Sequence, residues 1–234
     1  ARAAFSDDTL LLERLIERPR HIEVQVRASP LDRETITENN EAHGVLRVRP
    51  GREKVLYLEG EPRPEFGFVR RAVADDSALQ LVGVLRSAPG KYLRLGVDDS
   101  LELATGFPTR RADLFAQRAI ILGNIEAAYF SGDQLRMLGE FVSRRGGGLL
   151  MLGGRATLAE GGFAGTPVDE ALPLALSGAR ETATGEPFLE VAVRPTPAGL
   201  AQPMLQLADT RAANVARWYS LPMLRSVNRL GALR

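Results

Sequence analysis

A short apolar run with glycines on both sides, residues 146–154, constrains the fold of this chain more than any other stretch. It reads GGGLLMLGG and is followed by Arg155. An unbroken apolar run of this length is typical of a buried strand in a parallel sheet. In an open α/β sheet, ligands bind at the turn that leaves the carboxyl end of a strand, and a nucleophile elbow stands there too. Because this turn holds Gly153, Gly154 and Arg155, we expect a close backbone approach without a nucleophile.

Strands and helices alternate in the region that leads to this run. Apolar segments predict strands at residues 55–58, 79–85 and 120–123, and Pro62 and Pro64 predict the start of a helix after the first of them. A capping box of Ser131 and Gln134 predicts a second helix. This order predicts an α/β fold, a flavodoxin-like, doubly wound domain with a mainly parallel sheet. The connection 86–118 has little periodicity, and we interpret it as a lid or an ornament.

The two ends of the chain differ in pattern from the middle. Residues 6–18 predict a short capped helix, and residues 21–27 and 46–49 alternate as half-buried antiparallel strands do. Two or three strands cannot close a sandwich. We therefore expect residues 1–52 to form a helix and a β-strand arm, a partial sandwich-like segment, before an α/β domain at residues 53–182. A strand at 188–193 and an anchored apolar segment around Trp218 predict that residues 183–234 pack on that domain.

Composition excludes several classes of function. The net charge is +1 and no basic patch stands out, so we expect no nucleic-acid partner. There is no Cys, and His21 and His43 both precede the α/β region, so it has neither a thiol nucleophile nor a His base. We expect no metal and no cofactor. No apolar run reaches the ~20 residues of a membrane span. Because the chain begins without Met, we interpret it as a piece of a longer protein.

Chemistry, if any, is expected at the carboxyl ends of adjacent strands, which converge on one rim. One hypothesis is a hydrolase in which Glu59 or Glu61 is the base and Arg63 or Arg155 holds an anion. In the plainer interpretation, these carboxylates cap the following loop or form internal salt bridges with the arginines. A third hypothesis is a small-ligand sensor that uses the backbone of the glycine turn, although neither a Walker nor a dinucleotide motif is present. The rim candidates are Glu59, Glu61, Arg63, Asn124, Gly153, Gly154 and Arg155.

Several short motifs together resemble one family. They include KVLYLEGEPR at 54–63, LGG at 152–154 and Leu172-Pro173. On these, residues 54–175 resemble the class I glutamine amidotransferase-like fold, in the branch found in bacterial membrane proteins that also carry von Willebrand factor A domains. Residues 34–40 resemble the penultimate hairpin of the sandwich that precedes such domains. Trp218, Leu221-Pro222 and Asn228 resemble their trailing segment.

The resemblance implies a fold without its usual activity. In true amidotransferases the strand matching residues 149–152 ends in a Cys nucleophile, which a His and a Glu assist. Here that position is Gly153 and no His follows it, so we expect the chain not to be an enzyme. The resemblance implies a pseudoenzyme module for ligand binding or protein docking, with other domains or subunits of a cell-envelope complex as partners. It also implies the soluble portion of a membrane-anchored bacterial protein, on the periplasmic side.

Overall fold

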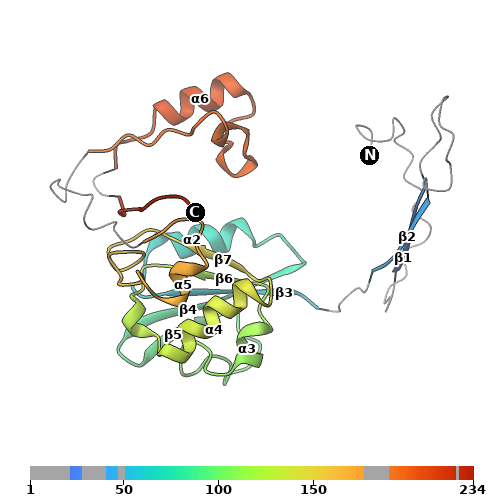
Figure 1. The fold of residues 1–234 in the computed structure, drawn as a ribbon, viewed down its shortest axis with the longest axis vertical. Helices are drawn as coiled ribbons and strands as arrows, with labels where there is room; N and C mark the ends of the chain where they lie inside the picture. Colours follow the sequence, from blue (N-terminus) through green and yellow to red (C-terminus); the bar gives the residue numbers. More distant parts are fainter. Residues whose placement is uncertain (1–21, 28–40, 47–50, 177–189, 225–226) are drawn as a thin grey trace. The chain divides into compact units, whose positions relative to one another are not determined.

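The computed structural model describes residues 22–27, 41–46, 51–176, 190–224 and 227–234. The chain divides into two compact units, Ala1–Arg52 and Glu53–Arg234. In the first unit β1 (Ile22–Arg27) and β2 (Glu41–Leu46) pair antiparallel (Figure 1). β1 agrees with the strand expected at 21–27, whereas β2 lies before the strand expected at 46–49. The expected helix at 6–18, the hairpin at 34–40 and residues 47–49 of the second expected strand lie outside the described residues, and of that strand only its first residue, Leu46, is described.

The second unit contains a five-stranded mixed sheet in the order β5-β4-β3-β6-β7. Four strands are parallel, and β5 pairs antiparallel with β4 at one edge. The α/β prediction is therefore confirmed, with a mostly parallel sheet. The strands are β3 (Glu53–Glu59), β4 (Leu79–Ala88), β5 (Lys91–Leu95), β6 (Ala119–Leu122) and β7 (Gly148–Met151).

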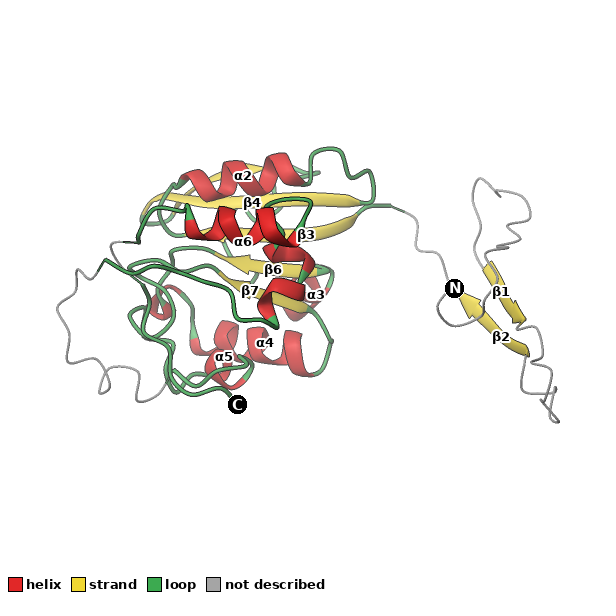
Figure 2. Cartoon of the chain, turned by 90° about the horizontal axis from the view of Figure 1, so that it is seen from above, coloured by secondary structure: helices red, strands yellow, loops and turns green. Residues whose placement is uncertain are grey.

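Helices cover both faces of this sheet. Figure 2 shows α2 (Pro64–Ala72) on one side and α3 (Arg111–Phe115), α4 (Gly132–Ser143) and α5 (Pro167–Glu170) on the other. Side chains of successive strand residues point to opposite faces, so Leu56 and Leu58 pack in a core with Phe141 of α4. Tyr57, between them, packs against Phe66 of α2 in a second core, with the two ring centroids 5.1 Å apart. Central strands buried on both faces explain the near-continuous apolar runs of the sequence.

The capping box predicted for α4 is present. Ser131 Oγ accepts a hydrogen bond from Gln134 N, and the Gln134 side chain accepts one from Ser131 N. The Gln134 amide also donates to the Phe107 and Pro108 carbonyls, at 3.2 and 3.3 Å. The cap therefore ties the start of α4 to the loop before α3.

The apolar run 149–152 is expected to form a buried strand of a parallel sheet. It does form a parallel strand, β7, but this strand is only partly buried. β7 is an edge strand with a single neighbour, β6, and 47% of Leu150 is exposed. Leu149 and Met151 face the core on the α4 side. The glycine before the strand has a packing reason, since a Cβ on Gly147 would lie 2.2 Å from the Phe141 ring.

The connection 86–118 is neither a lid nor an ornament. It contains β5, which continues the sheet after a tight turn at Gly90 with φ +69°, and the short helix α3. Gly adopts this left-handed conformation without strain. The alternation of Lys91-Tyr92-Leu93-Arg94-Leu95 after a Pro-Gly pair is the signal that could have predicted this hairpin.

The C-terminal part contains no strand of the expected length among its described residues. Residues 188 and 189 lie outside them, and Val191 forms only an isolated bridge with Leu224. Trp218, in α6 (Arg211–Tyr219), is anchored as expected, because its indole N–H donates to the Leu205 carbonyl at 2.9 Å. The expected domain boundary at residues 182/183 lies outside the described residues.

Short 3-10 turns occur at η2 (Ala127–Tyr129), η3 (Gly199–Ala201) and η4 (Pro203–Leu205).

Candidate functional site

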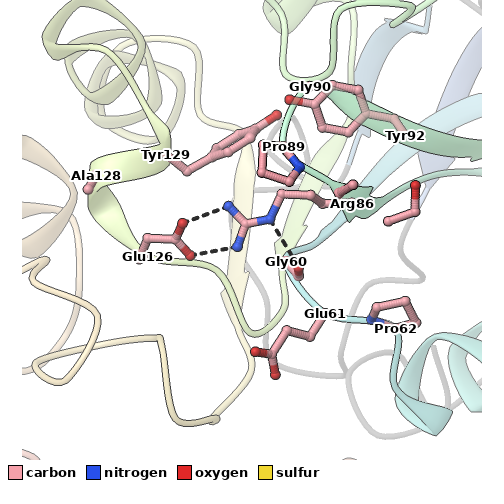
Figure 3. A pocket seen from close by; sticks show the side chains of 12 residues that line it. Gly60, Glu61, Pro62, Arg86, Pro89, Gly90, Tyr92, Glu126, Ala128 and Tyr129 are labelled. Carbon is pink, nitrogen blue, oxygen red and sulfur yellow. Dashed lines mark hydrogen bonds and ion pairs between the residues drawn. The ribbon is translucent and has the colours of Figure 1, made fainter.

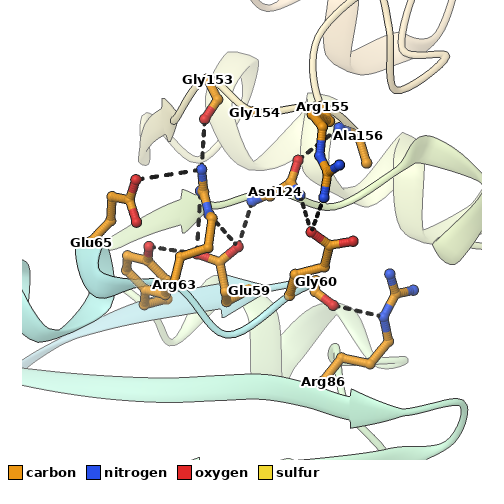
Figure 4. A network of polar contacts seen from close by, with 12 residues as sticks. Glu59, Gly60, Arg63, Glu65, Arg86, Asn124, Gly153, Gly154, Arg155 and Ala156 are labelled. Atoms are coloured by element: carbon orange, nitrogen blue, oxygen red, sulfur yellow. Dashed lines mark hydrogen bonds and ion pairs between the residues drawn. The ribbon is translucent and has the colours of Figure 1, made fainter.

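The structure brings the seven rim residues expected from the sequence together at the carboxyl ends of β3, β6 and β7 (Figure 4). At their centre is the Glu59 carboxylate, which is fully buried. It accepts hydrogen bonds from Tyr57 Oη at 2.8 Å and from the backbone N–H of Asn124 at 2.6 Å. The guanidinium of Arg63 donates twice more, from Nε and Nη2, both at 3.3 Å. Four donors thus compensate one buried carboxylate, as burial of a charge requires.

Asn124 and Arg63 connect this carboxylate to the neighbouring loops. Asn124 Nδ2 donates to Glu61 Oε2 at 2.9 Å, and Asn124 Oδ1 accepts from the N–H of Ala156 at 2.7 Å. Arg63 Nη1 donates to the Gly153 carbonyl at 2.9 Å. The loops after three parallel strands are therefore held together by side chains. Arg63 forms an internal salt bridge with Glu59, as the plainer interpretation expected. The capping that this interpretation also expected is not found at α2, because the N-cap of α2 has no side-chain hydrogen bond.

The remaining charged rim residue, Arg155, contributes little to this network. Its side chain is 89% exposed, and its nearest carboxylate oxygen, on Glu61, is 3.7 Å away. An exposed ion pair at that distance contributes at most a few tenths of a kcal/mol.

Each glycine of the rim faces a polar group at close range. A Cβ on Gly123 would lie 2.3 Å from Glu59 Oε2, and one on Gly60 would lie 2.1 Å from the Asn124 carbonyl oxygen. A Cβ on Gly154 would lie 2.5 Å from Asn124 Oδ1. Real side chains do not approach so closely. These glycines therefore make room for the protein's own polar network, and the tight-turn interpretation is the better account of them.

Asn228 closes the turn where a nucleophile elbow was considered. Its Oδ1 accepts from Gly154 N at 2.9 Å, and its Nδ2 donates to Gly154 O at 2.8 Å and to Glu160 Oε2 at 2.9 Å. A Cβ on Gly153 would meet the same Oδ1 at 2.7 Å. Both backbone polar groups of Gly154 are thus occupied, so its N–H is not open to a phosphate. From the sequence, Asn228 was assigned to a trailing segment, and its place at the rim was not predicted.

Protonation at this site follows from burial and hydrogen bonding. Burial raises the pKa of Tyr57 well above its usual range, and the hydrogen bond to the Glu59 carboxylate raises it further, so Tyr57 keeps its proton. Burial alone would raise the pKa of Glu160. Hydrogen bonds from Asn228 and from the backbone N–H of Arg229 outweigh it and hold that pKa below the usual value. Glu160 is therefore an anion that holds the segment containing Asn228.

A cavity of about 680 Å³ opens beside the rim, between the loops after β3, β4 and β6 (Figure 3). Arg86, at the end of β4, forms a two-pronged ion pair with Glu126, at 2.6 and 2.9 Å. Its Nε also donates to the Gly60 carbonyl at 3.1 Å, and its guanidinium lies 5.5 Å from the centre of the Tyr129 ring. The cavity is lined by Gly60, Glu61, Pro62, Arg86, Ser87, Ala88, Pro89, Gly90, Tyr92, Glu126, Ala128 and Tyr129.

The ion pair in the cavity stays charged over a wide pH range. The hydrogen bonds to Glu126 raise the pKa of Arg86, and the same bonds lower the pKa of Glu126. The sequence reasoning missed this pair, although Arg86 follows the predicted strand 79–85 directly and the strand-end rule applies to it. Tyr92 was missed because it lies on the unrecognised strand β5.

Comparisons with known proteins add one local similarity. A family model described as "Carbamoyl-phosphate synthase L chain, ATP binding domain" matches residues 1–49 of the 234. The match ends before β3, so it includes none of the rim or cavity residues. No curated protein and no solved structure matches the chain.

The described residues contain neither a metal-ligand cluster nor a membrane-spanning helix. Within residues 22–27, 41–46, 51–176, 190–224 and 227–234, no cluster of three or more His, Cys, Asp or Glu side chains could hold a metal ion. In the same part of the chain, no helix is long and apolar enough to cross a membrane.

Proposed function

We propose that residues 53–234 are a non-catalytic class I glutamine amidotransferase-like module of a larger bacterial cell-envelope protein, and that this module binds a small ligand at the carboxyl ends of its strands. The strand order supports a flavodoxin-like arrangement. The four parallel strands follow one another along the chain as β3, β4, β6 and β7, and across the sheet they lie in the order β4-β3-β6-β7. The second strand of the chain therefore lies beside the first, followed by the third and the fourth, as at the start of the flavodoxin-like order. Ligands of doubly wound sheets bind where that order reverses, here between β3 and β6.

One observation carries the proposal: the elbow is closed while a cavity beside it is open. Asn228 occupies both backbone polar groups of Gly154, and Arg63 occupies the Gly153 carbonyl. The cavity next to it, about 680 Å³, has the size of a small-molecule site. A binding function explains both features, because it needs a concave surface but no nucleophile.

The hydrolase hypothesis is less well supported. A general base must reach a substrate proton with a free oxygen lone pair. Glu59 is fully buried, and four donors surround it. The Glu61 side chain is 54% exposed, and its Oε2 already accepts a hydrogen bond from Asn124 and lies 3.7 Å from Arg155. The geometry therefore favours a structural role for Glu59.

A thermal-shift screen tests the binding function. The purified chain is heated with panels of sugars, nucleotides and amino acids. A ligand that binds the native state raises the melting temperature, because it adds about 2.7 kcal/mol to the unfolding free energy at a hundredfold excess over Kd. We expect Ala128→Trp, which fills the cavity mouth, to abolish the shift. Ala74→Trp, at an exposed position outside the cavity, is the matched control. A shift that survives A128W, no shift with any panel, or ammonia release from glutamine would contradict the proposal.

A further inference from the structure

The cavity beside the rim presents hydrogen-bond donors and acceptors together. Of the five N–H groups of a guanidinium, Arg86 uses three, two on Glu126 and one on the Gly60 carbonyl. The other two have no partner among the described residues. Of the roughly four lone-pair sites of a carboxylate, those of Glu126 receive two bonds from Arg86 and one from its own backbone N–H. The side chain of Arg86 is 22% exposed and that of Glu126 is 35% exposed. A ligand therefore meets donors and acceptors at the same edge of one ion pair.

The charge of the lining disfavours a charged ligand. Arg86 is the one cation and Glu61 and Glu126 are the two carboxylates among the lining residues. An anion that bonds to the two unused N–H groups of Arg86 would lie close to the carboxylates of Glu126 and Glu61, which repel it. A cation would have to approach the guanidinium of Arg86, which is paired with Glu126 in the same cavity. A neutral ligand meets neither penalty, since it can bond to the pair without breaking it.

Aromatic rings supply the apolar part of the wall. Tyr92 and Tyr129 stand nearly perpendicular, with ring centroids 6.3 Å apart and an interplanar angle of 81°, and Pro89 lies between the ends of their side chains in Figure 3. A flat C–H face of a saturated ring can pack on such a wall. The ligand then needs polar groups on its rim and an apolar face.

We propose that the cavity binds a neutral carbohydrate ring. Each hydroxyl both donates and accepts, so a pair of adjacent hydroxyls bonds to Arg86 and Glu126 at the same time, while the ring face packs on Tyr92 or Tyr129. This assignment rests on the proposed binding function and specifies its ligand class.

The site is held in place before a ligand arrives. Three hydrogen bonds and the Tyr129 ring fix the Arg86 guanidinium. The hydroxyl of Tyr129 accepts the N–H of Phe107 at 3.2 Å. Groups that are already ordered lose little entropy on binding, which favours measurable affinity for a small neutral ligand.

Saturation-transfer NMR and titration calorimetry on the full chain test the assignment. The probes are glucose, galactose, mannose and maltose, with glucuronate and glucosamine as anionic and cationic counterparts. We expect transfer to the ring C–H protons of at least one neutral sugar and weaker binding of its charged counterpart. Arg86→Lys keeps the positive charge but removes the planar guanidinium that bonds through two nitrogens at once, so it should weaken binding by about tenfold or more. Arg110→Lys, in the exposed pair with Asp113, is the matched control and should leave it unchanged.

The variants distinguish failure of the ligand class from failure of the site. If R86K melts below the assay temperature, Tyr92→Leu on the edge strand β5 replaces it, and the same weakening is expected because the ring is removed. Binding of a nucleotide or amino acid in the cavity, with no neutral sugar bound, would overturn the carbohydrate assignment and leave the binding function standing. No binding by any probe or panel would overturn both.

Discussion

At the scale of single residues, the buried carboxylate and its glycine depend on each other. The Glu59 carboxylate cannot move without losing four hydrogen bonds, and a Cβ on Gly123 would lie 2.3 Å from it. We expect Gly123→Ala to lower the free energy of unfolding by about 1–3 kcal/mol, as overpacking of a rigid site does. Urea unfolding followed by circular dichroism measures this difference.

Gly132→Ala is the control for that substitution. Gly132 is the first residue of α4, and a Cβ there would meet nothing within 4 Å. Ala is favoured over Gly in a helix by up to about 1 kcal/mol, so G132A should be neutral or slightly stabilising. Equal losses for the two variants would mean that removal of glycine itself, and not the contact with Glu59, sets the cost.

The sequence predicted the grouping of the rim residues but not their purpose. Glu59, Asn124 and Gly153 each follow a strand, and parallel strands end at one edge, so their proximity follows from topology. The partners that close the site are not encoded locally: Asn228 is 74 residues from Gly154, and Arg86 is 40 from Glu126. Only the folded chain shows that the glycines accommodate side chains of the protein itself.

At the scale of elements, the position of a strand in the sheet decides how much its apolar residues contribute. Leu122 on β6 is fully buried between two neighbouring strands, whereas 47% of Leu150 on the edge strand β7 is exposed. We expect Leu122→Ala to cost about 2–5 kcal/mol of unfolding free energy, as in other cores. Leu150→Ala should lower the unfolding free energy by about 1 kcal/mol or less, because folding removes less of the apolar surface of Leu150 from water.

Chemical denaturation of the two Leu variants, with the wild type as reference, makes this comparison. A loss for L150A as large as that for L122A would show that the outer face of β7 is covered in solution, and would contradict its edge position. The sequence could not make this distinction, because an apolar run between glycines looks the same at the edge and in the centre of a sheet. Local signals such as the Ser131 capping box, by contrast, predicted α4 correctly.

At the scale of the whole molecule, the last described residues of the chain contact much earlier residues of the α/β unit. Leu233 forms a bridge with Leu174, and the N–H of Ala175 donates to the Ala232 carbonyl at 2.8 Å. Arg234 contacts Asp169 through its side chain, 65 residues away in sequence. Together with Asn228 on the glycine turn, these contacts make the C-terminal segment part of the domain, but no local pattern in the sequence indicates which residues form them.

Asp169 makes this closure dependent on pH. Its carboxylate, 3% exposed as a residue, accepts from the N–H groups of Gly165 and Leu176 at 2.9 and 3.0 Å and from Arg234 Nη2 at 3.1 Å. Burial alone would raise its pKa, but these bonds outweigh burial and lower the pKa below the usual Asp value. A lowered folded-state pKa stabilises the fold above the ordinary value of about 4, and this stabilisation is lost as pH falls through the folded-state pKa.

We therefore expect Asp169→Asn to lower the unfolding free energy at pH 7 by about 1–3 kcal/mol, since the amide places a donor where three N–H groups converge. The difference from the wild type should shrink as pH falls below about 4, because the wild-type carboxyl then takes up its proton. Urea titrations at a series of pH values measure both quantities. Asp75→Asn, at an exposed turn position, should change stability by less than about 0.5 kcal/mol at every pH. A D169N penalty that stays constant down to pH 3 would mean that the carboxylate charge does not hold the C-terminal segment.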